Sequence, residues 1–291
     1  MAYVGGAKAE LRDQLGPATK VIGYLQSGAR VRILSRRPRW AEVRAPDGAT
    51  GWVLQRHLVS QAVFDQFAAL AREAAELPSQ GQAVIRRRAN LHLRPGREEA
   101  VFYQLTEGEL VDVVGHQVAP RHAEPENPPG QETSSADALA NRPAATPEDW
   151  LLVRASRNRT GWLLEASADL NPPLEVAQYR EGLPLRAWFV IHREIDQGVE
   201  RPWYLWATIR RRAGWPYDFD EIRVFVWNPR AGRYETSYRE RNLKGFYPIR
   251  VGRRDTAQGS APAFQLELEN DRGERFQKNY FMVGRQVRVE R

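Results

Sequence analysis

The sequence offers few side chains arranged for catalysis or metal binding. It has no cysteine, which excludes a thiol nucleophile, a disulfide and a Cys-ligated zinc ion. It contains no glycine-rich phosphate loop. The histidines show no ligand spacing of the His-x-x-Glu-His type; they are His57, His92, His116, His122 and His192. This pattern predicts a protein that is not an enzyme and that binds no cofactor and no metal.

Carboxylates are the remaining candidates for chemistry. A glycan-cleaving enzyme needs a carboxyl group with a raised pKa, and the 36 Asp and Glu residues leave that alternative open. Asp218, Asp220 and Glu221 form one acidic cluster. Oxygen ligands of this kind suit a calcium ion. The alternative, which we expect here, is a solvated turn that leads into a strand.

An internal repeat organises the first half of the chain. The spacing between the two tryptophans of each copy is 12, and the second copy holds a 30-residue insertion between its halves. Self-similarity of this kind predicts two copies of one structural unit. The equivalent pairs are Leu25 and Leu105, Gly28 and Gly108, Trp40 and Trp150, Val43 and Val153, Arg44 and Arg154, Gly51 and Gly161, and Trp52 and Trp162.

Each copy has the alternation of apolar and polar residues that is typical of half-buried strands. Val31 and Ile33 alternate with arginines, and this period of two leaves one face of a strand buried and the other in water. Asp47-Gly48 is a hairpin signal because glycine adopts the positive φ of a tight turn. Short strands with glycine turns over about 55–60 residues predict a small closed barrel.

The first copy resembles the bacterial SH3-like domain. The matching residues are Leu11-Arg12-Asp13, Gly16-Pro17, Lys20 to Leu25, Gly28, Trp40, Val43 and Gly51-Trp52-Val53. The second copy resembles the same family, although it departs through its insertion and a shorter loop before Val101; its matches are Asn90 to Gly96, Leu105, Gly108, Trp150, Gly161 and Trp162.

This resemblance implies recognition of cell-wall peptide, glycan or a protein partner without catalysis. The candidate ligand-binding residues are Tyr24, Trp40 and Trp52, with Tyr103, Trp150 and Trp162 in the second copy. The competing interpretation makes the tryptophans packing residues. We expect Trp52 and Trp162, which close equivalent hairpins, to be structural and largely buried.

The repeats are joined and interrupted by two segments of different character. Residues 60–80 predict a helical linker that begins at the N-cap Ser60 and stops at Pro78. Its apolar stripe consists of Val63, Phe67, Leu70, Ala74 and Leu77. Residues 117–148 hold six prolines and no aromatic residue. A segment of this composition buries too little surface to offset its ordering entropy, so a flexible insertion is expected.

The last part of the chain, residues 179–291, is predicted to be an antiparallel all-β meander, either a sandwich or a barrel. Three hairpins are expected, pairing 185–191 with 203–209, 222–227 with 233–238, and 264–269 with 274–276. The strand with Trp203, Tyr204, Leu205 and Trp206 is apolar on both faces. We expect both faces to be buried; the alternative is an exposed platform for sugar rings or peptide side chains.

Charge is concentrated in this last part. The formal net charge is +7 for the whole chain; residues 1–80 carry +4, residues 81–179 carry −4 and residues 180–291 carry +7. A basic rim for an anionic partner is predicted at strand ends, with scattered solvated arginines as the alternative; its members are Arg210, Arg211, Arg212, Arg250, Arg253 and Arg254. Nucleic-acid binding is not expected, because the two repeats together are near neutral.

The sequence thus predicts a mainly β chain. Two SH3-like barrels at 1–59 and 81–178, joined by the linker, precede the C-terminal domain. The expected function is a non-catalytic binding protein of the cell envelope that recognises peptidoglycan, another wall polymer or a protein partner. The alternative is a scaffold whose barrels only position a ligand-binding C-terminal domain. No membrane span and no signal peptide are recognised, so a periplasmic or extracellular location requires that an export segment was removed.

Overall fold

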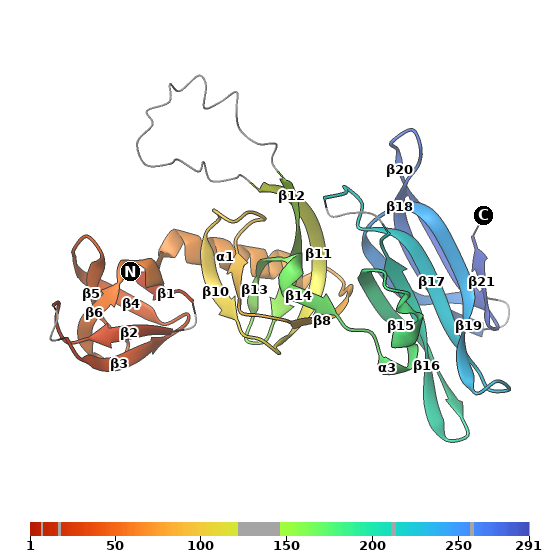
Figure 1. The fold of residues 1–291 in the computed structure, drawn as a ribbon, viewed down its shortest axis with the longest axis horizontal. Coiled ribbons are helices and arrows are strands. Elements are labelled where there is room, and N and C mark those ends of the chain that lie inside the picture. Colours follow the sequence, from red (N-terminus) through yellow and green to blue (C-terminus); the bar gives the residue numbers. More distant parts are fainter. Residues whose placement is uncertain (7, 17–18, 122–145, 211–213, 257–258, 291) are drawn as a thin grey trace.

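The computed structural model describes residues 1–291 except 7, 17–18, 122–145, 211–213, 257–258 and 291. In the described residues the chain is mainly β and forms three antiparallel sheets arranged one after another along the long axis of the molecule (Figure 1). The predicted fold class, a mainly β chain with antiparallel sheets, is confirmed.

The first barrel contains β1 to β7, with the strand order β3-β2-β6-β5-β4-β1-β7. Its core is formed by the inward residues of these strands, including Leu11, Val43 and Val53. The strand bounds are β1 Ala2–Val4, β2 Lys8–Arg12, β3 Val21–Gln26, β4 Arg30–Arg36, β5 Trp40–Arg44, β6 Thr50–Leu54 and β7 Leu58–Ser60, with the short helix η1 at Gln55–His57.

The second barrel has the corresponding strand order, β10-β9-β13-β12-β11-β8-β14. Its bounds are β8 Gly81–Ile85, β9 Ala89–His92, β10 Val101–Leu105, β11 Leu110–Arg121, β12 Thr146–Ala155, β13 Arg159–Leu164, η2 Glu165–Ser167 and β14 Ala168–Leu170. The repeated glycines have one packing role. A Cβ on Gly51 would lie 2.7 Å from the Arg12 carbonyl oxygen, and one on Gly161 would lie 3.0 Å from the His92 carbonyl oxygen.

The insertion begins later in the chain than its composition indicated. Residues 117–121 and 146–148 belong to β11 and β12, where Gln117 pairs with Trp150 and Arg121 pairs with Thr146. The expected flexible loop is therefore wrong at both ends, because the strand pairing that begins in the barrel continues to Arg121 and Thr146 despite the local composition. The rest of the insertion lies outside the described residues.

The linker forms helix α1 at Gln61–Ala75, with the Ser60 hydroxyl accepting a hydrogen bond from the Val63 amide. Its apolar stripe contacts both barrels. Phe67 packs with Tyr3 of the first barrel and Phe102 of the second, while Ala74 packs with Val114 and Leu152 of the second. The helix therefore fixes the angle between the barrels.

The C-terminal sheet has the order β15-β16-β17-β18-β19-β20-β21, and the three expected hairpins are present. It curls around an apolar core that includes Trp203, Leu205 and Phe264. The bounds are α3 Leu174–Ala177, η3 Gln178–Arg180, β15 Leu185–Asp196, β16 Val199–Thr208, β17 Phe219–Asn228, β18 Arg233–Thr256, β19 Gly259–Glu269, β20 Arg275–Val283 and β21 Gln286–Val289.

The second barrel and the C-terminal sheet share one apolar cluster. Tyr204 and Trp206, on the outer face of the sheet, join a cluster that also contains Leu151 and Val153 of the barrel. Both faces of β16 are therefore buried, as expected. Gln80 adds a polar link: its side chain, 0% exposed, accepts a hydrogen bond from the Ile249 amide at 2.8 Å and donates to the Ile249 carbonyl at 3.3 Å.

Candidate binding surface on the first barrel and between the barrels

The outer face of the first barrel brings its three candidate aromatic residues together. In β2, β5 and β6 alternate residues enter the core, which places the intervening side chains on the outside. Cross-strand register then makes Tyr24 a neighbour of Glu10, and Trp52 a neighbour of both Arg12 and Glu42. We call this face, with Tyr24, Trp40 and Trp52, the aromatic face.

The aromatic face is accessible and bordered by cations. Tyr24 is 53% exposed, and the Lys8 Nζ lies 4.3 Å from the centre of its ring. Trp40 lines a hollow of about 280 Å³ together with Arg12 and Leu54, and the Arg12 guanidinium lies 5.7 Å from the centre of the Trp40 ring. A cation near the face of an aromatic ring is attracted to it, so these contacts stabilise both rings at the surface.

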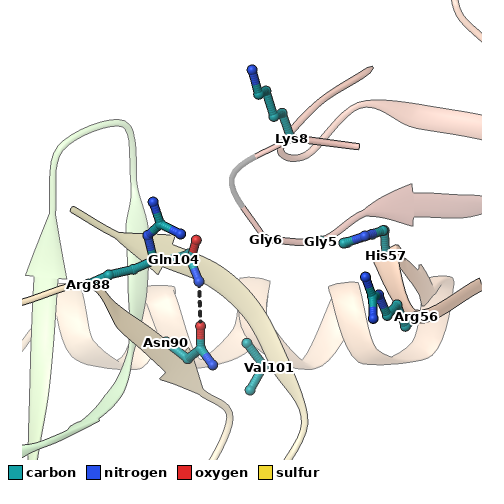
Figure 2. A pocket seen from close by; sticks show the side chains of 9 residues that line it. All are labelled: Gly5, Gly6, Lys8, Arg56, His57, Arg88, Asn90, Val101 and Gln104. Atoms are coloured by element: carbon teal, nitrogen blue, oxygen red, sulfur yellow. Dashed lines mark hydrogen bonds between the residues drawn. The ribbon is translucent and has the colours of Figure 1, made fainter. Parts of the chain in front are cut away.

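A cleft between the barrels continues this face. It has a volume of about 450 Å³ and shares Lys8, Arg56 and His57 with the Trp40 hollow. Figure 2 shows Arg56 and His57 on the wall contributed by the first barrel. The opposite wall belongs to the second barrel. We call this site the inter-barrel cleft; its lining residues are Gly5, Gly6, Lys8, Arg56, His57, Arg88, Asn90, Val101 and Gln104.

The equivalent face of the second barrel is covered by the chain itself. Trp150 is 2% exposed, with its ring centre 5.0 Å from that of His92. Trp162 and Leu152 pack against α1, and Tyr103 contacts Phe67 of the same helix, with ring centres 5.8 Å apart. All three candidate aromatic residues of this copy therefore make packing contacts, and none of them is exposed.

The structure gives the hairpin tryptophans intermediate burial, between the core and the exposed surface. Trp52 and Trp162 are both only partly buried, because the glycine before each is the residue that points into the barrel. The buried tryptophan of the repeat is Trp150, whereas its counterpart Trp40 remains partly exposed.

Arg210 lies apart from the other described arginines of the predicted basic rim. Arg210 donates from its guanidinium to Glu221 at 2.6 Å, and its amide donates to Asp220 at 3.1 Å. Arg253 lies near His192, whose strand partner is Trp203. Arg210 follows Trp203 by seven residues, which corresponds to about 20 Å along a strand. Arg210 is therefore far from Arg253.

Three other members of the predicted rim lie close to one another. Arg250, Arg253 and Arg254 line a hollow on β18 and β19, where Arg254 is paired with Glu290 at 2.8 Å. Arg211 and Arg212 lie outside the described residues.

The acidic cluster is buried, so the expected solvated turn is wrong. Asp218 and Asp220 are each 6% exposed and Glu221 is 0% exposed. Each has its own partners: Asp218 binds His116, Asp220 accepts from Arg210, and Glu221 is paired with arginines that include Arg223 at 2.6 Å. Across the described residues no three His, Asp or Glu side chains are grouped to hold a metal ion.

Sequence reasoning missed His116, which lies on β11 at the joint between the second barrel and the C-terminal sheet. Its Nδ1 is 2.5 Å from Asp218 and its Nε2 is 2.8 Å from Asp149. Burial lowers the pKa of His116, but the hydrogen bonds to both carboxylates outweigh burial and raise this pKa to about 9. We call His116, Asp149 and Asp218 the histidine joint.

The histidine joint is suited to hold two domains together. The charged imidazole donates both N–H groups to carboxylates, so neither nitrogen is free to act as a base. Asp149 also accepts from the Gly214 amide at 3.0 Å, and Arg186, paired with Glu165, lies 3.9 Å from Asp149. The alternation of Val111 and Val113 indicated only the first part of the strand that carries His116.

Comparison with known proteins identifies one of the three parts. Residues 9–59 match the family model of the bacterial SH3 domain, and they lie within the first barrel. No curated protein sequence matches the chain. None of the helices in the described ranges has the length and apolar character that a membrane crossing requires.

Two solved structures are similar at a low level. An NlpC/P60 family protein from Bacillus cereus ATCC 10987 is 12% identical, with 57% of this chain covered and a TM-score of 0.25; the chain spans 55% of that protein. NlpC2 from Trichomonas vaginalis is 11% identical, with 83% of this chain and 98% of that protein covered and a TM-score of 0.20. At these TM-scores neither likeness bears on the function of this chain.

Proposed function

We propose that the protein is a non-catalytic, cell-envelope-associated binding protein. Its SH3-like domains recognise peptidoglycan, another wall polymer or a protein partner. The observation that supports this proposal is the accessible aromatic face of the first barrel, which lies within a bacterial SH3 domain and is flanked by cations. A surface with exposed rings and adjacent charges is suited to stack on sugars or peptide side chains and to attract their carboxylates.

The second barrel is a further copy of the same domain in this proposal. Its strand order corresponds to that of the first barrel, and Gly161 repeats the close packing of Gly51. Because Trp150 is buried and Trp162 packs against α1, the second barrel does not bind the ligand through these two rings. Its role is to hold the first barrel and the C-terminal domain at a defined distance.

The alternative function is that of a scaffold, in which the barrels only position a ligand-binding C-terminal domain. The covered face of the second barrel and its shared apolar cluster with the C-terminal sheet favour this alternative. The two functions differ in which surface must be intact. The first requires the aromatic face, whereas the scaffold requires only that the barrels fold.

Co-sedimentation of the full chain with purified sacculi tests the proposal. Replacing Tyr24 and Trp40 together with alanine should weaken binding at least about tenfold, because truncated aromatic anchors dominate interface energies. The control is Phe276→Ala, which removes an aromatic side chain that is 44% exposed on the C-terminal domain. Unchanged binding by the Tyr24/Trp40 variant would favour the scaffold; loss in the control alone would place the ligand on the C-terminal domain.

The absence of catalysis has its own test. The chain has no cysteine, and His116 has both ring nitrogens engaged by carboxylates. We expect purified protein to release no muropeptides from sacculi above a heat-inactivated sample, as measured by chromatography of the soluble fraction. Release that disappears when a single carboxylate is replaced by its amide would contradict this expectation.

A further inference from the structure

The inter-barrel cleft contains three cations without a neutralising carboxylate. Lys8 comes from β2, Arg56 from η1 and Arg88 from the segment between β8 and β9. None of the three has an ion pair within the described part of the chain, and none of the described lining residues is acidic. The nearby Glu10 is already paired with Arg12 at 2.6 Å.

The remaining lining groups are polar and suited to an anion. The Gln104 side chain donates to the Asn90 amide oxygen at 3.0 Å (Figure 2), which orients the Asn90 amide. Burial, followed by the charge of Arg56, lowers the pKa of His57. The ring is therefore neutral at pH 7 and offers one N–H donor.

The cleft is held in shape by direct contacts between the barrels. The Gly6 amide of the first barrel donates to the Phe102 carbonyl of the second at 2.7 Å, and the adjacent Gly5 amide donates to the His57 carbonyl at 2.7 Å. Beside these bonds the Tyr3 ring stacks on Phe64 at 3.8 Å between ring centres. The walls that carry the cations are therefore fixed before any ligand arrives, which lowers the entropic cost of binding.

We propose that the inter-barrel cleft binds an anionic group, a carboxylate or a phosphate, of a ligand that continues onto the aromatic face. Positive charges on both walls of a concave site attract a counter-anion, because the field is focused there. A volume of about 450 Å³ admits a group with several negative charges. The inference rests on the proposed function only in that the ligand extends from the cleft to Tyr24 and Trp40.

Isothermal titration of the full chain at low ionic strength, with tripolyphosphate and with propane-1,2,3-tricarboxylate, tests the site. We expect at least one to bind, and the tighter of the two identifies phosphate or carboxylate as the natural group. The double variant Arg56→Gln/Arg88→Gln should weaken binding at least about tenfold, as expected for the loss of two charge-assisted contacts. The matched control Arg87→Gln removes an exposed charge that does not line the cleft and should change affinity less than twofold.

A second readout reports on the position of the anion. An anion in the cleft favours the charged imidazole and should raise the pKa of His57, which an NMR titration of the full chain measures with and without the probe. His192, which lies on the C-terminal domain, serves as the internal reference. No binding of either probe, equal losses in Arg87→Gln and the double variant, or an unmoved pKa of His57 would each overturn the inference.

Failure of this inference is distinguishable from failure of the proposed function. Sacculus binding that depends on Tyr24 and Trp40 while the cleft binds no anion would overturn the inference and leave the proposed function standing. Anion binding in the cleft with no binding to sacculi or to a protein partner would overturn the proposed function and leave the inference standing.

Discussion

Replacing His116 with alanine should lower the free energy of unfolding by about 3–5 kcal/mol, the usual effect of removing one partner from a buried ion pair. The variant leaves Asp149 and Asp218, with side chains 3% and 9% exposed, facing each other without the cation between them. Urea denaturation followed by tryptophan fluorescence measures the change. The control is His192→Ala, because His192 is partly exposed and has no hydrogen bond to any carboxylate of the described residues.

The same joint makes stability depend on pH in the alkaline range. His116 has a pKa of about 9 in the folded protein, compared with about 6.5 in an unfolded chain. A raised pKa contributes stability that is fully present below pH 6.5 and is lost as pH rises to 9. The total loss is about 3 kcal/mol, since each pKa unit corresponds to about 1.4 kcal/mol.

Asp149 and Tyr247, two titratable neighbours of His116, do not titrate in this pH range. The carboxyl of Asp149 is held below its usual pKa by the hydrogen bond from His116 and by Arg186, which outweigh burial. Burial raises the pKa of Tyr247 well above 10. Wild-type stability should therefore fall between pH 7 and pH 9, whereas that of His116→Ala should change little. Parallel pH profiles for the two proteins would show that the joint does not titrate as described.

The second large effect is expected at Trp150. Its replacement by alanine should destabilise the second barrel by about 3–5 kcal/mol, the cost of a large cavity in a packed region. The repeat supplies a matched control, because Trp40 occupies the equivalent position in the first barrel and is partly exposed. Trp40→Ala should cost about 1 kcal/mol, since the transfer term scales with the area removed from water.

Amide hydrogen exchange resolved by strand assigns each loss to its own barrel. Protection should fall in β11 to β13 for Trp150→Ala and change little in β4 to β6 for Trp40→Ala. Equal losses in the two variants would mean that the two tryptophans are equally buried in solution and that the aromatic face is closed.

Much of the local structure could be predicted from the sequence, because it depends on residues close together in the chain. Alternation at period two marked the strands of both barrels, and Ser60 with the stripe through Phe67 and Ala74 marked the helix. The repeat of Gly51 and Gly161 indicated a shared local packing, since at both positions a carbonyl approaches too closely for a side chain. The turn residues between the strands predicted the three C-terminal hairpins.

Which surfaces remain open was decided by tertiary structure alone. The corresponding faces of the two barrels differ, because α1 packs against Leu152 and Trp162 of the second barrel while Tyr24 of the first barrel stays exposed. The histidine joint unites residues separated by 33 and 102 positions, and the inter-barrel cleft takes its cations from three separate segments. Periodicity and spacing report which face of a strand is buried, but they contain no information on which distant strand or helix provides the burial. The packing of α1 and the docking of the C-terminal sheet supply that information, because long-range contacts form only when the whole chain has folded.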